Sequence, residues 1–398
     1  MNRDNYNRIG VKKSKMRKIL ANYNLDAMIV IDSLDVSYLS GYYNSDYHGV
    51  QRSTNESIFF AVIARNGPWF MIGRWPWDAG KSKDIFDECF RPQNRSIHVN
   101  SRLDLLVKSL QERNLADKKI GFDLDHFPAG WLMHIQKKVP KLKAVSAGKI
   151  MDDLRAVKSE KEVKLIRKAI LAIEDAFEFL ASNLRPGLRA REVGVMVAQR
   201  IASHDVLPTF CSATAEGADW QEPPYPNWFG NDPVPENGLF RLDVAASCQG
   251  YFADLQRTFL LGKVDKIVHK RYKELSDLKK EMARNVCPGI SIYKLHALFD
   301  KLRAEISPST MHSIHGVGLA VHEVPMTCYC ATCERNDPYG KYIIPEGFVF
   351  ASEAARGAHP DFPELGAMGE EDMYWLTSHG LKRLSSYSEG SLIKVKRS

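Results

Sequence analysis

The chain has 398 residues, of which 44% are hydrophobic, and a mean hydropathy of −0.31, as expected for a globular protein with room for two domains. No apolar run approaches the roughly 20 residues that cross a bilayer, and the first twenty residues lack the apolar core of a signal peptide. We therefore expect a cytoplasmic protein without a membrane partner. The net charge of +7 is largely local, since these twenty residues carry seven Lys or Arg against one Asp.

The basic N-terminal stretch has two interpretations. A nucleic-acid-binding arm or an organelle transit peptide would explain its charge. The sequence from residue 16 to 31, MRKILANYNLDAMIVI, instead has the pattern of an amphipathic helix followed by a buried strand. We favour the helix and expect no nucleic-acid partner.

The first third of the chain alternates helical and strand patterns. Short apolar runs that predict strands are 26–31, 58–64, 68–73 and 119–123, and a helical pattern covers 103–114. This alternation predicts an α/β N-terminal domain over residues 1–155.

A second domain is expected over residues 156–398. Ser159 followed by Glu162 forms a predicted capping box, which starts a long amphipathic helix that ends near Pro186. A helix at 190–204, a loop rich in Pro, Trp and Asn at 216–238, and two apolar strands at 238–247 and 250–262 follow. Helices and strands in separate runs predict an α+β domain.

Seven cysteines without a regular framework fit a reducing compartment. Cys328, Cys330 and Cys333 lie close together, and His322 or His359 could complete a zinc site with them. The pattern is incomplete as a zinc motif, so we expect a loop with incidental thiols there.

Two aspartates lie inside the apolar strands that follow the loop. Asp243 and Asp254 are separated by a short polar turn, so a hairpin would let both carboxylates face one another. A buried carboxylate needs a cation or strong donors. Two solutions are equally supported: ion pairs of Asp254 with Arg257 and of Asp243 with Arg241, or a metal site.

Further candidate ligands follow. Glu353 lies at the end of a predicted strand and Glu371 precedes another, while His315 and His322 stand seven apart with glycines between them. The two histidines alone match no zinc motif. Carboxylates with one imidazole suit Mn²⁺, Fe²⁺, Co²⁺ or Zn²⁺. Two bridging carboxylates can hold two such ions about 3.5 to 4 Å apart.

Five separated motifs together resemble those of the creatinase, aminopeptidase P and prolidase family, which has the pita-bread fold. They are LRAVKSEKEVKLIRKA, LDVAASCQGYFADLQRTF, HGVGLAVHEVP, PEGFVFASEA and EEDMYWLT, in that order along the chain. The segment YLSGYY at 38–43 also resembles a tyrosine-containing turn of the family's first domain. The resemblance implies a creatinase-like N-terminal domain and a pita-bread catalytic domain.

The resemblance also implies site residues. The metal ligands would be Asp243, Asp254, His315, Glu353 and Glu371. Asp254 and Glu371 would bridge both ions, Asp243 would bind one, and Glu353 would bind the other and handle a proton. His322 would bind substrate or stabilise a tetrahedral intermediate. Creatinase itself lacks this metal set, so a plain creatinase is not expected.

The implied function is that of a dinuclear Xaa-Pro peptidase or prolidase, which cleaves an amide C–N bond by a metal-bridged hydroxide. A homodimer is implied, with the N-terminal domain shaping the partner's pocket. One alternative is a metal-dependent lyase on a small molecule, as in dimethylsulfoniopropionate cleavage. Another is a binding protein that has lost catalysis, against which the intact set of acids argues.

Two positions depart from the family pattern. Pro224 precedes Tyr225 where the hydrolases usually carry a proton-shuttling histidine, and Gly369 stands where the peptidases carry an arginine. The aromatic residues of this loop either pack it or wall a pocket for a compact or cationic substrate, namely Trp220, Tyr225, Trp228 and Phe229. Without this histidine and this arginine, the protein would bind a peptide backbone and transfer its protons less well. We therefore expect ordinary Xaa-Pro dipeptides to be poor substrates.

Overall fold

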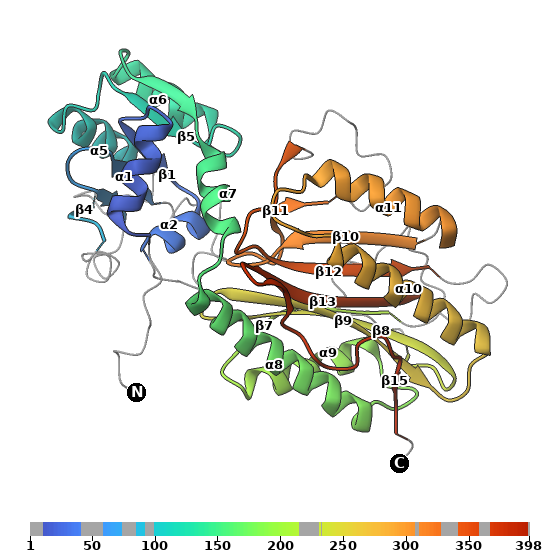
Figure 1. Cartoon of the computed structure of the whole chain (residues 1–398). Helices are drawn as coiled ribbons and strands as arrows, with labels where there is room; N and C mark the ends of the chain where they lie inside the picture. The colour runs from blue at the N-terminus through green and yellow to red at the C-terminus, as the bar shows by residue number, and fades with distance from the viewer. Residues whose placement is uncertain are drawn as a thin grey trace. The chain divides into compact units, whose positions relative to one another are not determined.

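The computed structural model describes residues 11–40, 59–73, 85–91, 99–214, 231, 233–306, 310–327, 341–357 and 367–396. The chain divides into two compact units, Met1–Arg155 and Ala156–Ser398, and each contains its own β-sheet (Figure 1). None of the helices within the described residues combines the length and apolarity of a membrane span.

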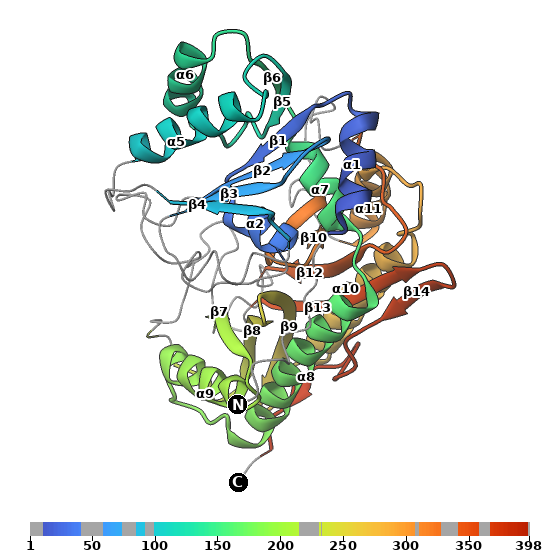
Figure 2. The ribbon, with the colours of Figure 1, turned by 90° about the vertical axis from the view of Figure 1, so that its left-hand side faces the viewer.

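The first unit is an α/β domain, as predicted. Its elements are α1 (Lys13–Asn22), β1 (Ala27–Val30), α2 (Ser33–Ser40), β2 (Phe60–Ala64), β3 (Phe70–Ile72), β4 (Glu88–Phe90), α5 (Val99–Glu112), β5 (Lys119–Phe122), α6 (Ala129–Lys138), β6 (Lys143–Ser146) and α7 (Gly148–Ala156). The strands form one mixed sheet in the order β4-β3-β2-β1-β5-β6, part of which faces the viewer in Figure 2.

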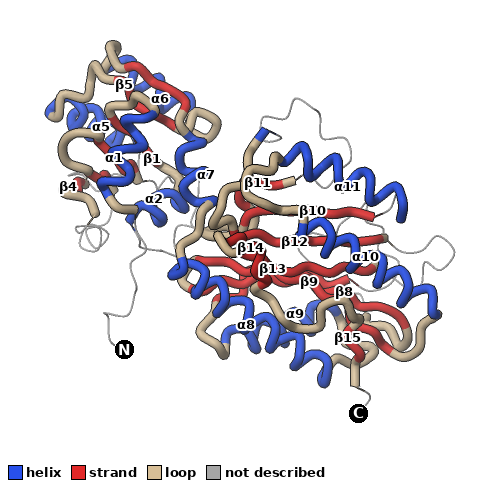
Figure 3. The backbone as a smooth tube through the Cα atoms, in the orientation of Figure 1, coloured by secondary structure: helices blue, strands red, loops and turns tan. Residues whose placement is uncertain are grey.

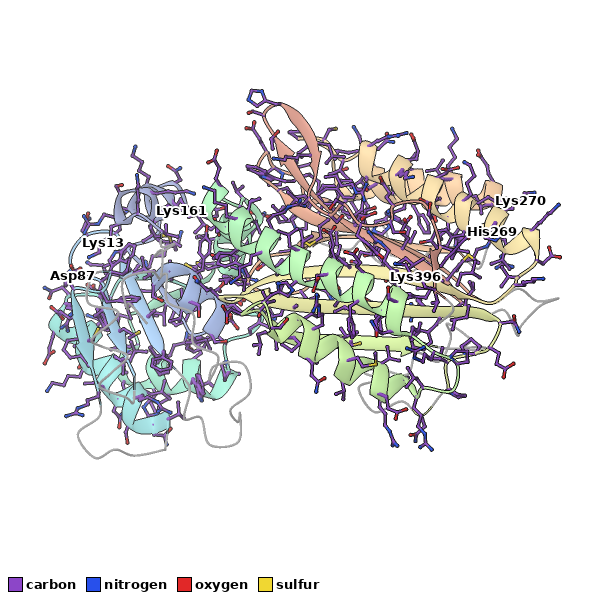
Figure 4. All side chains as sticks on the ribbon, turned by 90° about the horizontal axis from the view of Figure 1, so that it is seen from below. Lys13, Asp87, Lys161, His269, Lys270 and Lys396 are labelled. Atoms are coloured by element: carbon purple, nitrogen blue, oxygen red, sulfur yellow. The ribbon has the colours of Figure 1, made fainter. Side chains whose placement is uncertain are left out.

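The basic helix α1 is fixed to this unit by an ion pair. Lys13 lies 2.6 Å from Asp87, and both are labelled in Figure 4. The second carboxylate oxygen of Asp87 accepts a hydrogen bond from the backbone N–H of Trp69 at 2.8 Å. The helical interpretation of the basic stretch is therefore confirmed for residues 13–22.

The segment 38–43, which resembles a tyrosine-containing turn, is described only for its first three residues, the end of helix α2. Tyr38 lies in helix α2, where its hydroxyl donates a hydrogen bond to the carbonyl oxygen of Leu154 at 2.8 Å. Helix α2 begins after Asp32, whose side chain accepts hydrogen bonds from the backbone N–H groups of Leu34 and Asp35. These caps satisfy helix donors that would otherwise be unpaired. Residues 41–43 lie outside the described residues.

The second unit is built on a large, mainly antiparallel sheet, which Figure 3 shows with its flanking helices. Its elements are α8 (Glu160–Asn183), α9 (Ala190–Ala202), β7 (Leu207–Thr214), β8 (Gly238–Cys248), β9 (Tyr251–Leu261), α10 (Lys266–Arg284), α11 (Ile292–Ile306), β10 (Thr310–Gly316), β11 (Glu323–Met326), β12 (Val349–Arg356), β13 (Met368–Thr377), β14 (Gly380–Arg383) and β15 (Ile393–Lys394). The main path through the sheet is β11-β10-β12-β13-β9-β8-β7.

The predicted capping box of the long helix is confirmed. The Ser159 hydroxyl accepts from the backbone N–H of Glu162, and the Glu162 carboxylate accepts from the backbone N–H of Ser159. Helix α8 then packs against β8 and β9, while α9 packs against β7. Helix α10 packs against β12 and β13, and α11 against β10. The α+β architecture of this unit is as predicted.

Alternation along β12 and β13 separates a helix-covered face from an opposite, polar face. Phe350, Ala354 and Tyr374 belong to the hydrophobic core that includes residues of α10 and α11. Glu353 and Glu371 have the opposite parity in their strands, so they point away from that core. The candidate ligands therefore share the face opposite the helices.

An ionic network lies on the helix-covered side of β13. Lys279 of α10 contacts both Glu370 and Asp372, and Arg257 of β9 lies 2.7 Å from Asp372. Burial alone would raise the pKa of Asp372, but Arg257 and Lys279 lower it below its ordinary value. The two acids that flank Glu371 are thus anchored on one face, and Glu371 is directed to the other.

Candidate metal centre

One row of residues crosses the sheet of the second unit in exact register from strand to strand. Directly paired positions run across six strands in the order Ser212, Asp243, Gln256, Glu371, Glu353 and Ser313. Side chains of directly paired residues in antiparallel strands point to the same face. The row therefore brings three of the predicted ligands together although they are far apart in sequence.

The other two predicted ligands lie one step along the same face. Asp254 is two residues from Gln256 on β9, and His315 is two residues from Ser313 on β10, so strand alternation keeps them on the row's face. The β8–β9 hairpin has the expected form, because Cys248 pairs with Tyr251 across a two-residue turn.

Two overlapping groups of ligand atoms result. The first comprises Asp243, Asp254 and Glu371, and the second comprises His315, Glu353 and Glu371; within each group the ligand atoms lie within 4.8 Å of one another. Glu371 belongs to both groups. All of these residues except Asp243 are buried, with Asp243 partly exposed. The set offers oxygen donors and one nitrogen donor, which suits a transition-metal dication.

The surroundings of His315 suit a metal-binding imidazole. Burial lowers the pKa of His315 to about 3, with His322 as a further cause, so the ring is neutral. Its Nδ1 lies 3.3 Å from the carbonyl oxygen of Gly316, and its Nε2 lies 3.3 Å from Glu371 Oε1. A proton on Nδ1 would be donated to that carbonyl, which leaves the Nε2 lone pair toward the carboxylates. A backbone acceptor on the second nitrogen is common for metal-ligating histidines.

The clustered carboxylates of the site repel one another unless a cation lies between them. Burial, Asp243 and Glu353 together raise the pKa of Asp254 well above its ordinary value. Burial and neighbouring acids, Asp254 first among them, do the same to the pKa of Glu371. Asp254 Oδ1 is buried and accepts no hydrogen bond from any residue that the structure describes. Clustered acids of this kind are stabilised by bound cations, so the residues fit one or two divalent ions.

The ion-pair alternative fails for Asp254. Arg257, its proposed partner, points to the other face and binds Asp372. Arg241 does act on Asp243: burial raises the pKa of Asp243, while the Arg241 charge and a hydrogen bond from Gln256 oppose that rise.

His322 lies beside this cluster. Its ring centroid is 4.4 Å from that of His315, with the rings nearly perpendicular. His322 is exposed, yet partial desolvation still lowers its pKa below the ordinary value. A third group of neighbouring ligand atoms joins Asp254, His315 and His322. Geometry alone therefore permits His322 either to ligate an ion or to contact a substrate.

A buried ion pair fixes the segment between the two histidines. Lys158 Nζ lies 2.8 Å from Glu323 Oε2, and both side chains are almost fully buried. Glu323 Oε1 accepts hydrogen bonds from the backbone N–H groups of Leu319 at 3.0 Å and Ala320 at 3.3 Å. A methyl group at Gly318 would lie 2.5 Å from Glu323 Oε2. Glycine is needed there so that this carboxylate can bind the turn that precedes His322.

Replacing Glu323 by Gln is expected to destabilise the second unit by about 3–5 kcal/mol, because Lys158 would be left buried without its counter-ion. The measurement is the urea midpoint of unfolding. The exposed pair Lys273–Asp277 on α10 supplies the control, since Asp277→Asn should change stability by less than about 1 kcal/mol. Equal stability of the two variants would contradict this role for Glu323.

Several sequence predictions lie outside the described residues. These are the loop residues Trp220, Pro224, Tyr225, Trp228 and Phe229, and the cysteines Cys328, Cys330 and Cys333 with His359. Among described residues, sequence reasoning missed Gln256, Lys158 and Glu323 as parts of the site. Gln256 could have been found, because it lies two residues from Asp254 in the same strand.

Comparisons with known proteins identify the family of both domains. The sequence model of metallopeptidase family M24 matches residues 164–378, and that of the creatinase/prolidase N-terminal domain matches residues 12–157. The Xaa-Pro dipeptidase of Pyrococcus horikoshii is 28% identical over 379 residues, which cover 94% of this chain and 96% of that protein.

Solved structures show the same fold. The X-Pro aminopeptidase of Thermotoga maritima superposes with a TM-score of 0.74 at 17% identity, covering 96% of this chain and 99% of that one. The N-terminal domain of the FACT complex subunit SPT16 of chickpea gives a TM-score of 0.70 at 14% identity, covering 96% of each chain. Because a FACT subunit shares the fold, the chemistry must be argued from the site.

Proposed function

Because the chain belongs to metallopeptidase family M24, we propose that it is a metal-dependent peptidase of the Xaa-Pro dipeptidase type, which hydrolyses the amide C–N bond before a proline. The observation that supports this most strongly is the pair of three-residue ligand groups that share Glu371. A binding protein without catalysis would gain nothing from burying four acids together.

We propose two divalent ions as the cofactor, of Mn, Fe, Co or Zn. Asp243 would bind one ion, and His315 and Glu353 the other, while Asp254 and Glu371 would bridge both. The overlap of the two groups at Glu371 supports this division. When bound, such ions supply Lewis acidity and lower the pKa of a coordinated water.

The chain's own side chains would perform the remaining chemistry. Glu353 would accept the proton of the attacking water as a general base. His322 would donate a hydrogen bond to the carbonyl oxygen as negative charge develops on it. Its position beside His315 and its exposure support contact with a bound substrate. The partners would be a short peptide or small molecule and, from the resemblance, a second copy of the chain.

Metal-dependent release of free amine from Xaa-Pro peptides tests the proposal. The panel contains Xaa-Pro dipeptides, longer Xaa-Pro peptides and small quaternary-ammonium or sulfonium acids, each with Mn²⁺, Fe²⁺ or Co²⁺ and with chelator. We expect dipeptide turnover to be slow, because a missing proton donor typically costs about 10²–10⁴ in rate. Pro224→His should raise kcat, whereas Pro226→His should not.

The identity of the products separates the outcomes. Hydrolysis of an Xaa-Pro bond that stops with chelator supports the proposal. An alkene formed from a sulfonium acid, with every Xaa-Pro peptide intact, would replace the peptidase with a lyase. Dipeptide turnover by the unchanged protein at an ordinary enzymatic rate would refute the expectation that dipeptides are poor substrates.

A further inference from the structure

Gln256 occupies the middle of the row of site residues, between Asp243 on one neighbouring strand and Glu371 on the other. Its side chain is fully buried. A glutamine amide placed among carboxylates is polar and neutral, so it must be held there by hydrogen bonds rather than by charge.

The amide nitrogen of Gln256 joins two of the proposed ligands. Nε2 donates to Asp243 Oδ2 at 3.0 Å and to Glu353 Oε1 at 3.1 Å. These two carboxylates belong to different ligand groups. With a cation bound, both carboxylates would be ionised and could only accept, so the NH₂ group of the amide would be the donor. Gln256 thus links one half of the candidate centre to the other.

The side chain reaches Glu353 by crossing β13 at Gly369. A methyl group at Gly369 would lie 1.5 Å from Gln256 Oε1 and 3.3 Å from Arg241 Cδ. The space above Gly369, where the family resemblance places an arginine, is therefore filled by the Gln256 amide and the aliphatic part of the Arg241 side chain. A side chain at position 369 and the present position of Gln256 exclude one another.

We propose that Gln256 is a positioning residue for the metal centre, and that Gly369 is required because it leaves room for the Gln256 amide to bridge Asp243 and Glu353. Gln256, which lies on β9, then occupies the space that an arginine side chain at position 369 would fill. This inference rests on the proposed metal ligation. Partners that orient metal ligands in this way typically change metal affinity by about 10–100-fold.

Titration of metal-free protein with Mn²⁺, followed by electron paramagnetic resonance, tests the inference through a readout other than activity. Gln256→Met keeps the length of the side chain and removes the donor, so Mn²⁺ affinity should fall about 10–100-fold while the thermal midpoint of the metal-free protein stays near that of the unchanged protein. The Mn²⁺–Mn²⁺ coupling in the spectrum should also weaken.

A double-mutant cycle tests the shared space. Gly369→Ala should displace the Gln256 amide and lower Mn²⁺ affinity as Gln256→Ala does. In the Gln256→Ala background, the added methyl group no longer meets the amide and has only the tight contact with Arg241 Cδ at 3.3 Å, so Gly369→Ala should cause little further loss; this non-additivity is the expected signature of residues in contact. Gly130→Ala, at a glycine with no neighbour within 4 Å of the new methyl group, is the control and should leave Mn²⁺ affinity unchanged.

The Mn²⁺ titration distinguishes a failure of the proposed metal centre from a failure of the positioning role of Gln256. If the unchanged protein binds no Mn²⁺, the metal centre itself is refuted. If it binds Mn²⁺ and Gln256→Met binds equally well, or if the losses from Gly369→Ala and Gln256→Ala simply add, the positioning role is refuted while the metal centre stands.

Discussion

Replacing Asp254 by Asn is expected to abolish metal-dependent turnover and to remove most of the bound divalent ions. Asp254 lies among three other acids, is almost fully buried, and has a carboxylate oxygen that no described residue binds. An amide offers one neutral acceptor oxygen in place of an anionic carboxylate, so it cannot bridge two dications.

Elemental analysis after loading with Mn²⁺ and desalting provides the measurement. The unchanged protein should hold about two ions per chain, as expected for a two-metal site, and Asp254→Asn clearly fewer. The same substitution should stabilise the metal-free protein, because it removes one of several repelling charges. Asp265→Asn is the control, since asparagine also caps a helix such as α10. Unchanged metal content in Asp254→Asn would refute the bridging role.

Replacing His322 by Ala is expected to preserve metal content and to lower kcat by roughly 10²–10³, the usual effect of removing one donor to a developing oxyanion. His322 lies beside the proposed ligand His315 but is exposed, whereas the proposed ligands are buried or, for Asp243, half-buried. Stopped assays at saturating peptide give kcat, and elemental analysis gives the metal content of the same samples.

His379→Ala serves as the matched control, because His379 lies in the turn between β13 and β14 and should leave both quantities unchanged. Loss of an ion from His322→Ala would show that the group of Asp254, His315 and His322 is the real coordination set. His322 would then be a metal ligand together with His315, and not a substrate contact.

Strand alternation explains why much of the site could be predicted from sequence. Asp243, Asp254 and Glu353 lie inside apolar strands, where a carboxylate is costly unless it has a partner. The choice between Glu370 and Glu371 could not be made from alternation alone, because both neighbours are acids. The structure favours Glu371, because Lys279 binds Glu370 on the helix-covered face while Glu371 lies among the other candidate ligands.

The role of Gln256 was not predictable in the same way. It depends on the register of β9 against β13, which are separated by more than a hundred residues in sequence, and on the space above Gly369. From sequence, Gly369 was interpreted only as a lost arginine. The buried contact of Lys158 with Glu323 is another long-range pairing, which local patterns do not encode.

The position of β13 has a consequence for how the protein matures. In the sheet, β13 stands between β12 and β9, so the part of the centre on β8 and β9 joins the part on β10 and β12 through this strand. Glu371, which both ligand groups share, is the last of the five to leave the ribosome. In a nascent chain that ends before β13, the candidate ligands on β8 and β9 are not yet joined to those on β10 and β12. The edges of β9 and β12 that pair with β13 are then open, which favours mispairing. The proposed centre would therefore be complete only after β13 has paired with both β9 and β12, so metal binding would stabilise the protein only once these two parts of the sheet are joined.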